Sequence, residues 1–360
     1  MPINVALGHV SNAFMITALV VYSLSVVAFA GDFAFARPKR AAATASTRQA
    51  QDRAAALAAV GAASATGDGG AASAAGDGGA GDGSARPATA PESMPELALS
   101  WPAAVRQAGR WVQAAVVFSF LGVLAHTTAV VTRGFAVHRA PWGNMYEFVT
   151  ALTCVAAIFF LYAMLRYRTW TLGVFVMGSI VVALGLAETL IFTAPGDLVP
   201  ALQSYWLDIH VTAMTLATGI FFVAAVLGVI YLWVDRTSRR TPAGDAPENG
   251  IVRRLPSLEQ LDRLTYRTVV FGFPVWTFGV IAGAIWADQA WGRYWGWDPV
   301  ETWAFITWVL YAAFLHARAT AGWRGRRAHY IQLLGFASLM FNILVVQVFI
   351  TGLHSYAGVS

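Results

Sequence analysis

The sequence predicts an all-α, polytopic integral membrane protein with about eight transmembrane helices and an external tryptophan-rich segment. Hydrophobic residues make up 57% of the chain and charged residues 12%, about half the charged fraction of roughly 25% that is usual in soluble domains. Eight apolar segments are long enough to cross the hydrocarbon of a bilayer, which takes about 20 residues. They lie near residues 11–31, 110–132, 146–165, 170–192, 208–234, 268–287, 301–317 and 330–351.

Positive charge is distributed unevenly among the connecting segments. Basic residues gather in alternate loops, at 37–53, 166–168, 236–254 and 318–327, and loops of this kind face the cytoplasm. Both termini and the tryptophan-rich segment are then external. Topology therefore accounts for the net charge of +5, and nothing in the chain indicates nucleic-acid binding.

Composition divides the chain into three regions. Residues 1–35 hold the first transmembrane helix, and residues 36–108 are rich in Ala and Gly with hardly an aromatic side chain. Such a segment cannot bury enough apolar surface to fold, so we expect a disordered cytoplasmic loop. Residues 109–360 form the membrane domain proper. Its one cysteine, Cys154, excludes a CxxC pair and covalent CxxCH heme attachment within this chain.

Tryptophan is concentrated in one stretch, where six of the 14 lie in the 23 residues from Trp286 to Trp308. Tryptophan favours the membrane interface, but six rings beside fixed charges suit a large planar ligand better than anchoring alone. An aromatic belt without a ligand is the alternative. Within the stretch, Asp298-Pro299-Val300-Glu301 has the pattern of a capping box with proline at the first helical position, so a helix begins at Asp298. Ser257 with Gln260 predicts a second, short helix before the sixth span.

Two histidines share the external face with the tryptophan-rich segment. His210 lies at the start of the fifth span, where Asp208 could orient its imidazole, and His354 lies at the end of the last span. Two neutral imidazoles on opposite sides of a planar macrocycle are a standard way to hold heme iron. The pair therefore predicts a heme site, against the alternative that each ring only makes a structural hydrogen bond.

Two further histidines lie inside spans. His316 comes 15 residues after Glu301, which is about 22 Å along a helix. It therefore lies near the cytoplasmic side, too far away to share an iron with the external pair. His126, in the outer half of the second span, could be a ligand, a donor to a propionate or a packing group. Packing is favoured because polar groups commonly join helices inside membranes.

The stretch WGRYWGWDPVETWAFITW, followed by His316, resembles the tryptophan-rich WWD signature of heme-handling proteins in cytochrome c maturation. The similarity is to the CcsA/ResC type, labelled CcsB in some bacteria, of the two-subunit System II cytochrome c synthase. APWGNMYEF at 140–148, LDIHVTAM at 207–214 and GLHSYAG at 352–358 extend it. The resemblance covers roughly residues 110–360, with the WWD segment at 286–303.

The resemblance implies that His210 and His354 ligate an external heme b, and that His316 ligates an inner heme on its way out. It also implies a ResB/Ccs1-type membrane subunit that supplies another intramembrane histidine. If the partner does not supply it, His126 is the candidate for the second ligand of the inner heme. Arg293 is the candidate propionate contact, because guanidinium binds carboxylate in a forked geometry. The residues expected at the heme sites are His210, His354, His316, His126, Trp291, Trp295, Trp297, Asp298 and Arg293.

The implied function is heme transport across the bacterial cytoplasmic membrane and presentation of reduced heme to the CxxCH sequence of apocytochrome c for thioether attachment. This is a holocytochrome c synthase, or heme lyase, activity shared with the partner subunit, and thiol-reducing thioredoxin-like proteins are further expected partners. The alternatives are a b-type heme electron-transfer subunit and a heme exporter without ligation activity. The external position of the best histidine pair favours the synthase, since electron-transfer subunits usually hold their hemes within the bundle.

Overall fold

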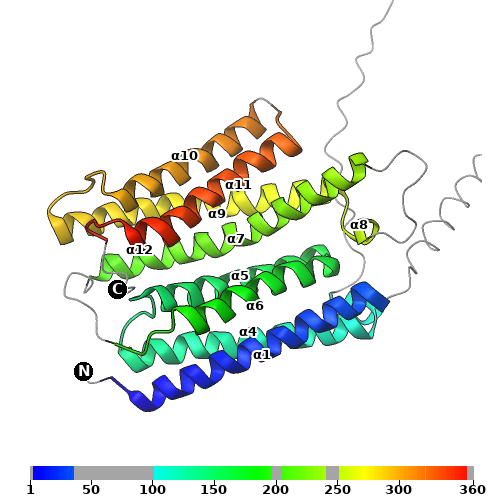
Figure 1. Ribbon diagram of the computed structural model, residues 1–360, viewed down its shortest axis with the longest axis horizontal. Helices are drawn as coiled ribbons and strands as arrows, with labels where there is room; N and C mark the ends of the chain where they lie inside the picture. Colours follow the sequence, from blue (N-terminus) through cyan, green and yellow to red (C-terminus); the bar gives the residue numbers. More distant parts are fainter. Residues whose placement is uncertain (1–2, 36–100, 197–203, 241–250, 321, 355–360) are drawn as a thin grey trace, which may run out of the picture. The chain divides into compact units, whose positions relative to one another are not determined.

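The computed structural model describes residues 3–35, 101–196, 204–240, 251–320 and 322–354. The chain divides into two units, and one of them, Phe35–Ser100, lies almost wholly outside the described residues. The disordered loop expected at 36–100 therefore stays a prediction. The other unit, made of Met1–Ala34 and Trp101–Ser360, contains the helices labelled in Figure 1.

Eight helices are long and apolar enough to span a membrane, and the described part of the chain contains no strand. The predicted all-α, polytopic class is thus confirmed. The spanning helices are α1 (Val5–Phe35), α4 (Arg110–Val137), α5 (Met145–Tyr167), α6 (Gly173–Leu190, after the 3-10 turn η1, Trp170–Leu172), α7 (Tyr205–Arg240), α9 (Leu258–Trp291), α10 (Pro299–Ala319) and α11 (Arg326–Phe341). A π-helical turn, η3 (Asn342–Val346), and α12 (Gln347–Phe349) continue α11, and α3 (Trp101–Ala108) and α8 (Ile251–Arg254) lie between spans.

Two boundaries differ from the sequence prediction. Residues 101–108, expected within the disordered loop, form α3, which buries Ala104 and accepts a 2.9 Å hydrogen bond at the Arg106 carbonyl from Gln113 of α4. Packing against α4 thus orders this end of the loop. The helix capped by Ser257 is not short but runs on through Pro274 to the end of α9, because membrane helices tolerate an internal proline.

The helices α7 and α9 pack along each other in antiparallel orientation (Figure 1). Three glycines of α9 permit this approach, because a Cβ on any of them would lie 2.6–2.8 Å from a side chain of α7. The facing pairs are Gly272 with Phe221, Gly279 with Met214, and Gly283 with His210. The spacing of seven and four residues is the same on both helices, as an antiparallel pair requires. Small residues of this kind let membrane helices come into close contact.

A buried ion cluster holds the loop between α4 and α5. The Glu147 carboxylate accepts from Arg133 Nε at 3.1 Å and Arg139 Nη1 at 2.7 Å, and the backbone N–H of Gly143 donates to it at 2.9 Å. The Glu147 side chain is fully buried and that of Arg133 is 3% exposed. Charges taken out of water need such pairing, so the cluster locks the 139–144 loop to the bundle.

Replacing Glu147 with alanine leaves Arg133 buried without its partner. Breaking a buried ion pair in this way costs about 3–5 kcal/mol, so we expect the thermal unfolding temperature of the full-length protein in detergent to fall. Arg239→Ala is the control, because the Arg239 side chain of the Asp235 pair is 61% exposed and such pairs contribute about 0.2–1 kcal/mol. Equal effects of the two substitutions would contradict the structural role of the cluster.

Candidate functional site

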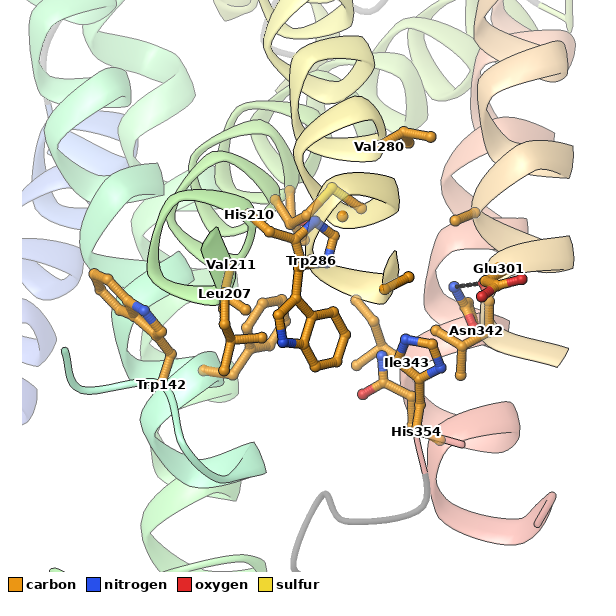
Figure 2. A pocket seen from close by; sticks show the side chains of 18 of the residues that line it. Trp142, Leu207, His210, Val211, Val280, Trp286, Glu301, Asn342, Ile343 and His354 are labelled. Carbon is orange, nitrogen blue, oxygen red and sulfur yellow. Dashed lines mark hydrogen bonds between the residues drawn. The ribbon is translucent and has the colours of Figure 1, made fainter. Parts of the chain in front are cut away.

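A pocket opens where α5, α7 and α10 begin and where α9 and the α11–η3 segment end. The empty space within its outline is about 1210 Å³, a figure that includes the part open to solvent. The wall is mostly apolar and aromatic, and it includes Trp142, Leu207, Val211, Trp286, Trp295 and Ile343. His210 and His354, far apart in sequence, both face this pocket (Figure 2).

His210 projects from the first turns of α7 and is held by the backbone of α9. Its Nδ1 lies 2.7 Å from the carbonyl oxygen of Gly279. A carbonyl can only accept, so Nδ1 donates, and in the neutral ring Nε2 then carries the lone pair. The sequence suggested Asp208 as the orienting group, which is wrong, because residues two apart on a helix point in different directions.

His354 is held by the carboxylate of Asp298. Its Nδ1 lies 2.8 Å from Asp298 Oδ1, and the Leu353 N–H donates to Oδ2 at 2.8 Å. The Val300 N–H also donates to Oδ1, at 3.1 Å, which makes Asp298 the N-cap of α10. Burial raises the pKa of Asp298, but these hydrogen bonds, with that of His354 foremost, outweigh it and leave the pKa below its ordinary value. A charged carboxylate thus orients the imidazole.

The predicted capping box at the start of α10 is confirmed, and it organises the loop before it. Glu301 Oε2 accepts from the N–H of Asp298 at 3.1 Å and from that of Gly296 at 2.8 Å. The chain near His354 approaches closely, because a Cβ on Gly352 would lie 2.6 Å from Asp298 Oδ2. One helix start therefore holds both the tryptophan-rich loop and the segment that carries His354.

The tryptophans and Arg293 occupy different positions around this frame. Trp291 meets the His354 ring edge to face at 5.0 Å, and Trp295 lines the pocket. Trp297 is 63% exposed and adopts a φ of 58°, with its ring edge to face with Trp295 at 5.7 Å. The guanidinium of Arg293 lies over Gly296, where a Cβ would fall 0.6 Å from Nη1. Trp297 and Arg293 therefore shape the loop, while Trp291 lies against His354 and Trp295 forms part of the pocket wall.

The other two histidines expected at the heme sites, His316 and His126, lie away from the pocket lining. His316 is exposed on the outward face of α10. Phe305 and Val309 are exposed on the same face. His126 is fully buried on α4, with its Nδ1 3.4 Å from the Tyr22 hydroxyl of α1. This contact agrees with the packing role that the sequence favoured for His126.

Three features of the site escaped the sequence reasoning. Trp286 contacts both imidazoles, Gly279 supplies the acceptor for His210, and the Trp142–Asn144 loop lines one wall. The glycines at 279 and 283 form a small-xxx-small pattern, which could have indicated close helix contact. Nothing in the local sequence indicates which α7 side chain lies against them.

Gly283→Ala tests the packing of His210. The added Cβ would lie 2.6 Å from ring atoms of His210, so the imidazole must move away from Gly279, at a cost of about 1–3 kcal/mol for overpacking. We expect a lower thermal unfolding temperature in detergent. Gly178→Ala in α6 is the matched control, because no neighbouring atom lies within 4 Å of its Cβ position. The packing argument fails if Gly283→Ala is as stable as Gly178→Ala.

The residues that form this site fall within a stretch that is similar to known proteins. Residues 142–354, which include both histidines and the tryptophan-rich loop, match the family of cytochrome C assembly proteins. The chain is 36% identical over 256 residues to a "Cytochrome c biogenesis protein CcsA" of Guillardia theta, covering 66% of this chain and 83% of that protein. It is 34% identical over 293 residues to one of Gloeobacter violaceus, covering 67% and 86%. The chain therefore belongs to the cytochrome c assembly protein family and is a CcsA-type protein of cytochrome c biogenesis.

Proposed function

We propose that the protein binds heme b in the pocket through His210 and His354 and presents it, reduced, to the CxxCH sequence of an apocytochrome c. The observation that carries this proposal is the fixed orientation of two imidazoles around one pocket. Each ring uses Nδ1 to donate to an acceptor of the fold, the Gly279 carbonyl or the Asp298 carboxylate. In that tautomer Nε2 is the nitrogen suited to a metal.

The ligand set suits a metal that arrives with most of its coordination already filled. Among the described residues, no group of three or more His, Cys, Asp or Glu side chains could hold a bare metal ion. Two imidazoles suffice for the axial positions of a porphyrin iron. The apolar and aromatic wall matches the faces of the macrocycle. These residues therefore fit heme better than an isolated cation.

We assign the pocket to the external side of the bacterial cytoplasmic membrane. The support is the distribution of basic residues along the helices that form it. Arg239 and Arg240 end α7, and Arg326 and Arg327 begin α11, at the helix ends opposite the pocket. Basic residues flank the cytoplasmic ends of membrane helices. The WWD segment and the N- and C-terminal ends of the chain would then face outward.

In thioether formation each cysteine S–H adds across one vinyl group, sulfur to one carbon and hydrogen to the next. Heme, when bound, supplies those vinyl groups, and the protein supplies binding, orientation and exclusion of water. Asp298 would orient His354, Trp291 would provide apolar surface beside that ring, and Trp295 would provide apolar surface elsewhere in the pocket wall. One of the two imidazoles has to give way when the histidine of CxxCH binds. This is the part of a holocytochrome c synthase reaction that the chain could perform with its partner.

We further assign His316 to an inner heme at the interface with a ResB/Ccs1-type subunit. An ionisable side chain on the lipid-facing side of a span is costly and usually functional, and His316 is exposed on the outward face of α10. A partner helix there could supply the second axial histidine. The single cysteine of this chain, Cys154, is buried and so cannot reduce the substrate cysteines. Thiol-reducing thioredoxin-like proteins would keep those cysteines reduced.

His210→Ala and His354→Ala test the pocket site in the full-length protein expressed with its partner. We expect each to alter or abolish the reduced six-coordinate heme spectrum and to lower covalent assembly of a CxxCH reporter by at least the roughly 10–100-fold that the loss of a residue orienting a ligand costs. Added imidazole should restore part of the assembly by taking the place of the missing ring. His138→Asn is the control, because His138 is exposed and has a φ of 53° that Asn tolerates.

Full assembly in either alanine variant would defeat the assignment of that histidine. If the wild type binds heme but attaches none covalently to the CxxCH reporter, the protein is better described as an electron carrier or a plain exporter. The spectrum and the reporter therefore separate binding from synthesis.

His316→Ala tests the inner site. We expect the heme content of the complex with the partner to fall, while the pocket keeps its six-coordinate spectrum, because His316 lies on a different part of α10 from the pocket lining. Val309→Ala, on the same outward face, is the control for lost packing against the partner. An unchanged heme content in His316→Ala would rule out this ligand.

A further inference from the structure

The indole of Trp286 lies between the two imidazoles of the pocket (Figure 2). Its ring is stacked with that of His210, at a centroid distance of 6.2 Å and an interplanar angle of 12°. It meets the His354 ring edge to face at 5.8 Å and 65°. Trp286 is only 1% exposed, and Trp291 packs edge to face against it at 4.7 Å. A bulky side chain thus occupies the position where a ligand shared by both histidines would bind.

We propose that Trp286 is a specificity-determining residue that keeps the two imidazoles apart until a planar macrocycle displaces it. This inference rests on the function proposed above. Non-bonded ring atoms stay about 3.5–4.0 Å apart, whereas a first-row metal holds an imidazole nitrogen at about 2 Å. With the indole between them, His210 and His354 cannot both reach one metal.

The separation has a chemical purpose. Two converging neutral imidazoles attract Cu²⁺, Ni²⁺ and Zn²⁺, whose affinity for nitrogen ligands exceeds that of Fe²⁺. A bare cation has no surface that could compensate for moving the buried Trp286 ring. A macrocycle has a large apolar face that can pack against the displaced indole and the aromatic wall. The site would therefore admit heme and refuse the free ion.

The position of Trp286 in the fold allows such a displacement. It lies in the last two turns of α9, and the helix ends at Trp291 with Gly292 in the left-handed conformation, at a φ of 69°. Trp286 forms part of the pocket wall. Displacement requires the indole to rotate toward the pocket, while the 2.7 Å contact of Nδ1 with the Gly279 carbonyl keeps His210 in place. Only the side chain has to move.

Trp286→Ala in the full-length protein tests the proposal with two probes. Binding of Zn²⁺ alone, measured by titration calorimetry on tag-free protein, should tighten at least about tenfold and disappear again in Trp286→Ala/His354→Ala. Association of reduced heme, followed by stopped-flow absorbance, should accelerate at least about tenfold without a change in the final six-coordinate spectrum. Both expectations follow if the conformer with the indole displaced makes up about 10% or less of the wild-type protein, because apparent affinity is reduced by the populated fraction of the binding-competent state. Removing the indole removes that reduction.

Trp276→Ala is the matched control. Trp276 is also on α9, is also 1% exposed and also lies along the pocket, but its ring contacts Phe221 at 6.1 Å and not the imidazoles. A variant that only loosens the pocket would behave like Trp276→Ala and would broaden or lose the six-coordinate spectrum. If Trp286→Ala unfolds, Trp286→Phe takes its place, because it removes less volume. Its Zn²⁺ affinity and its rate of heme association should rise above those of wild type, by less than the roughly tenfold expected for Trp286→Ala.

The outcomes separate this inference from the proposed function. Equal Zn²⁺ binding and equal heme association in the Trp286 and Trp276 variants would overturn the inference and leave the heme function standing. Tighter Zn²⁺ binding in Trp286→Ala, with no heme bound by any variant or by wild type with its partner, would support the separating role and overturn the heme function. Gains with both probes would support both.

Discussion

Close contact between α7 and α9 is the constraint on which the pocket depends. Helices in a bilayer gain little from burying apolar surface against each other, so small residues that bring backbones together provide the attraction. Gly272, Gly279 and Gly283 provide that contact along one face of α9. The consequence is chemical as well as mechanical, because His210 comes near enough for its Nδ1 to reach the Gly279 carbonyl at 2.7 Å. Helix packing thereby sets the orientation and tautomer of an imidazole.

The start of α10 fixes the orientation of the second imidazole, that of His354. Asp298 and Glu301 are ordinary capping residues, but their carboxylates also accept from the backbone of the tryptophan-rich loop and of the segment before His354. Hydrogen bonds of this kind are strengthened where water is scarce. One capping box thus links three stretches of chain, and movement of His354 would disturb the cap of α10.

Ion clusters tie the helices together at both ends, with apolar packing between. Glu147 pairs with Arg133 and Arg139 beside the pocket. At the opposite end Arg318 forks onto Asp262 at 2.7 and 2.9 Å, and His329 Nε2 lies 3.3 Å from the same carboxylate. These pairs join α9, α10 and α11.

Local pattern was enough to establish the class of the protein, its eight spans and both capping boxes, because hydropathy and capping depend on residues within a turn or a span of each other. It also grouped His210 and His354 with the tryptophan-rich segment, through the order in which the spans alternate. Their hydrogen-bond partners, the fold of Arg293 onto Gly296 and the position of Trp286 between the imidazoles were decided only by the tertiary structure. Each of these depends on the register in which distant helices pack. That register is set by the fit between whole helix surfaces, and residue spacing within one segment does not reveal it.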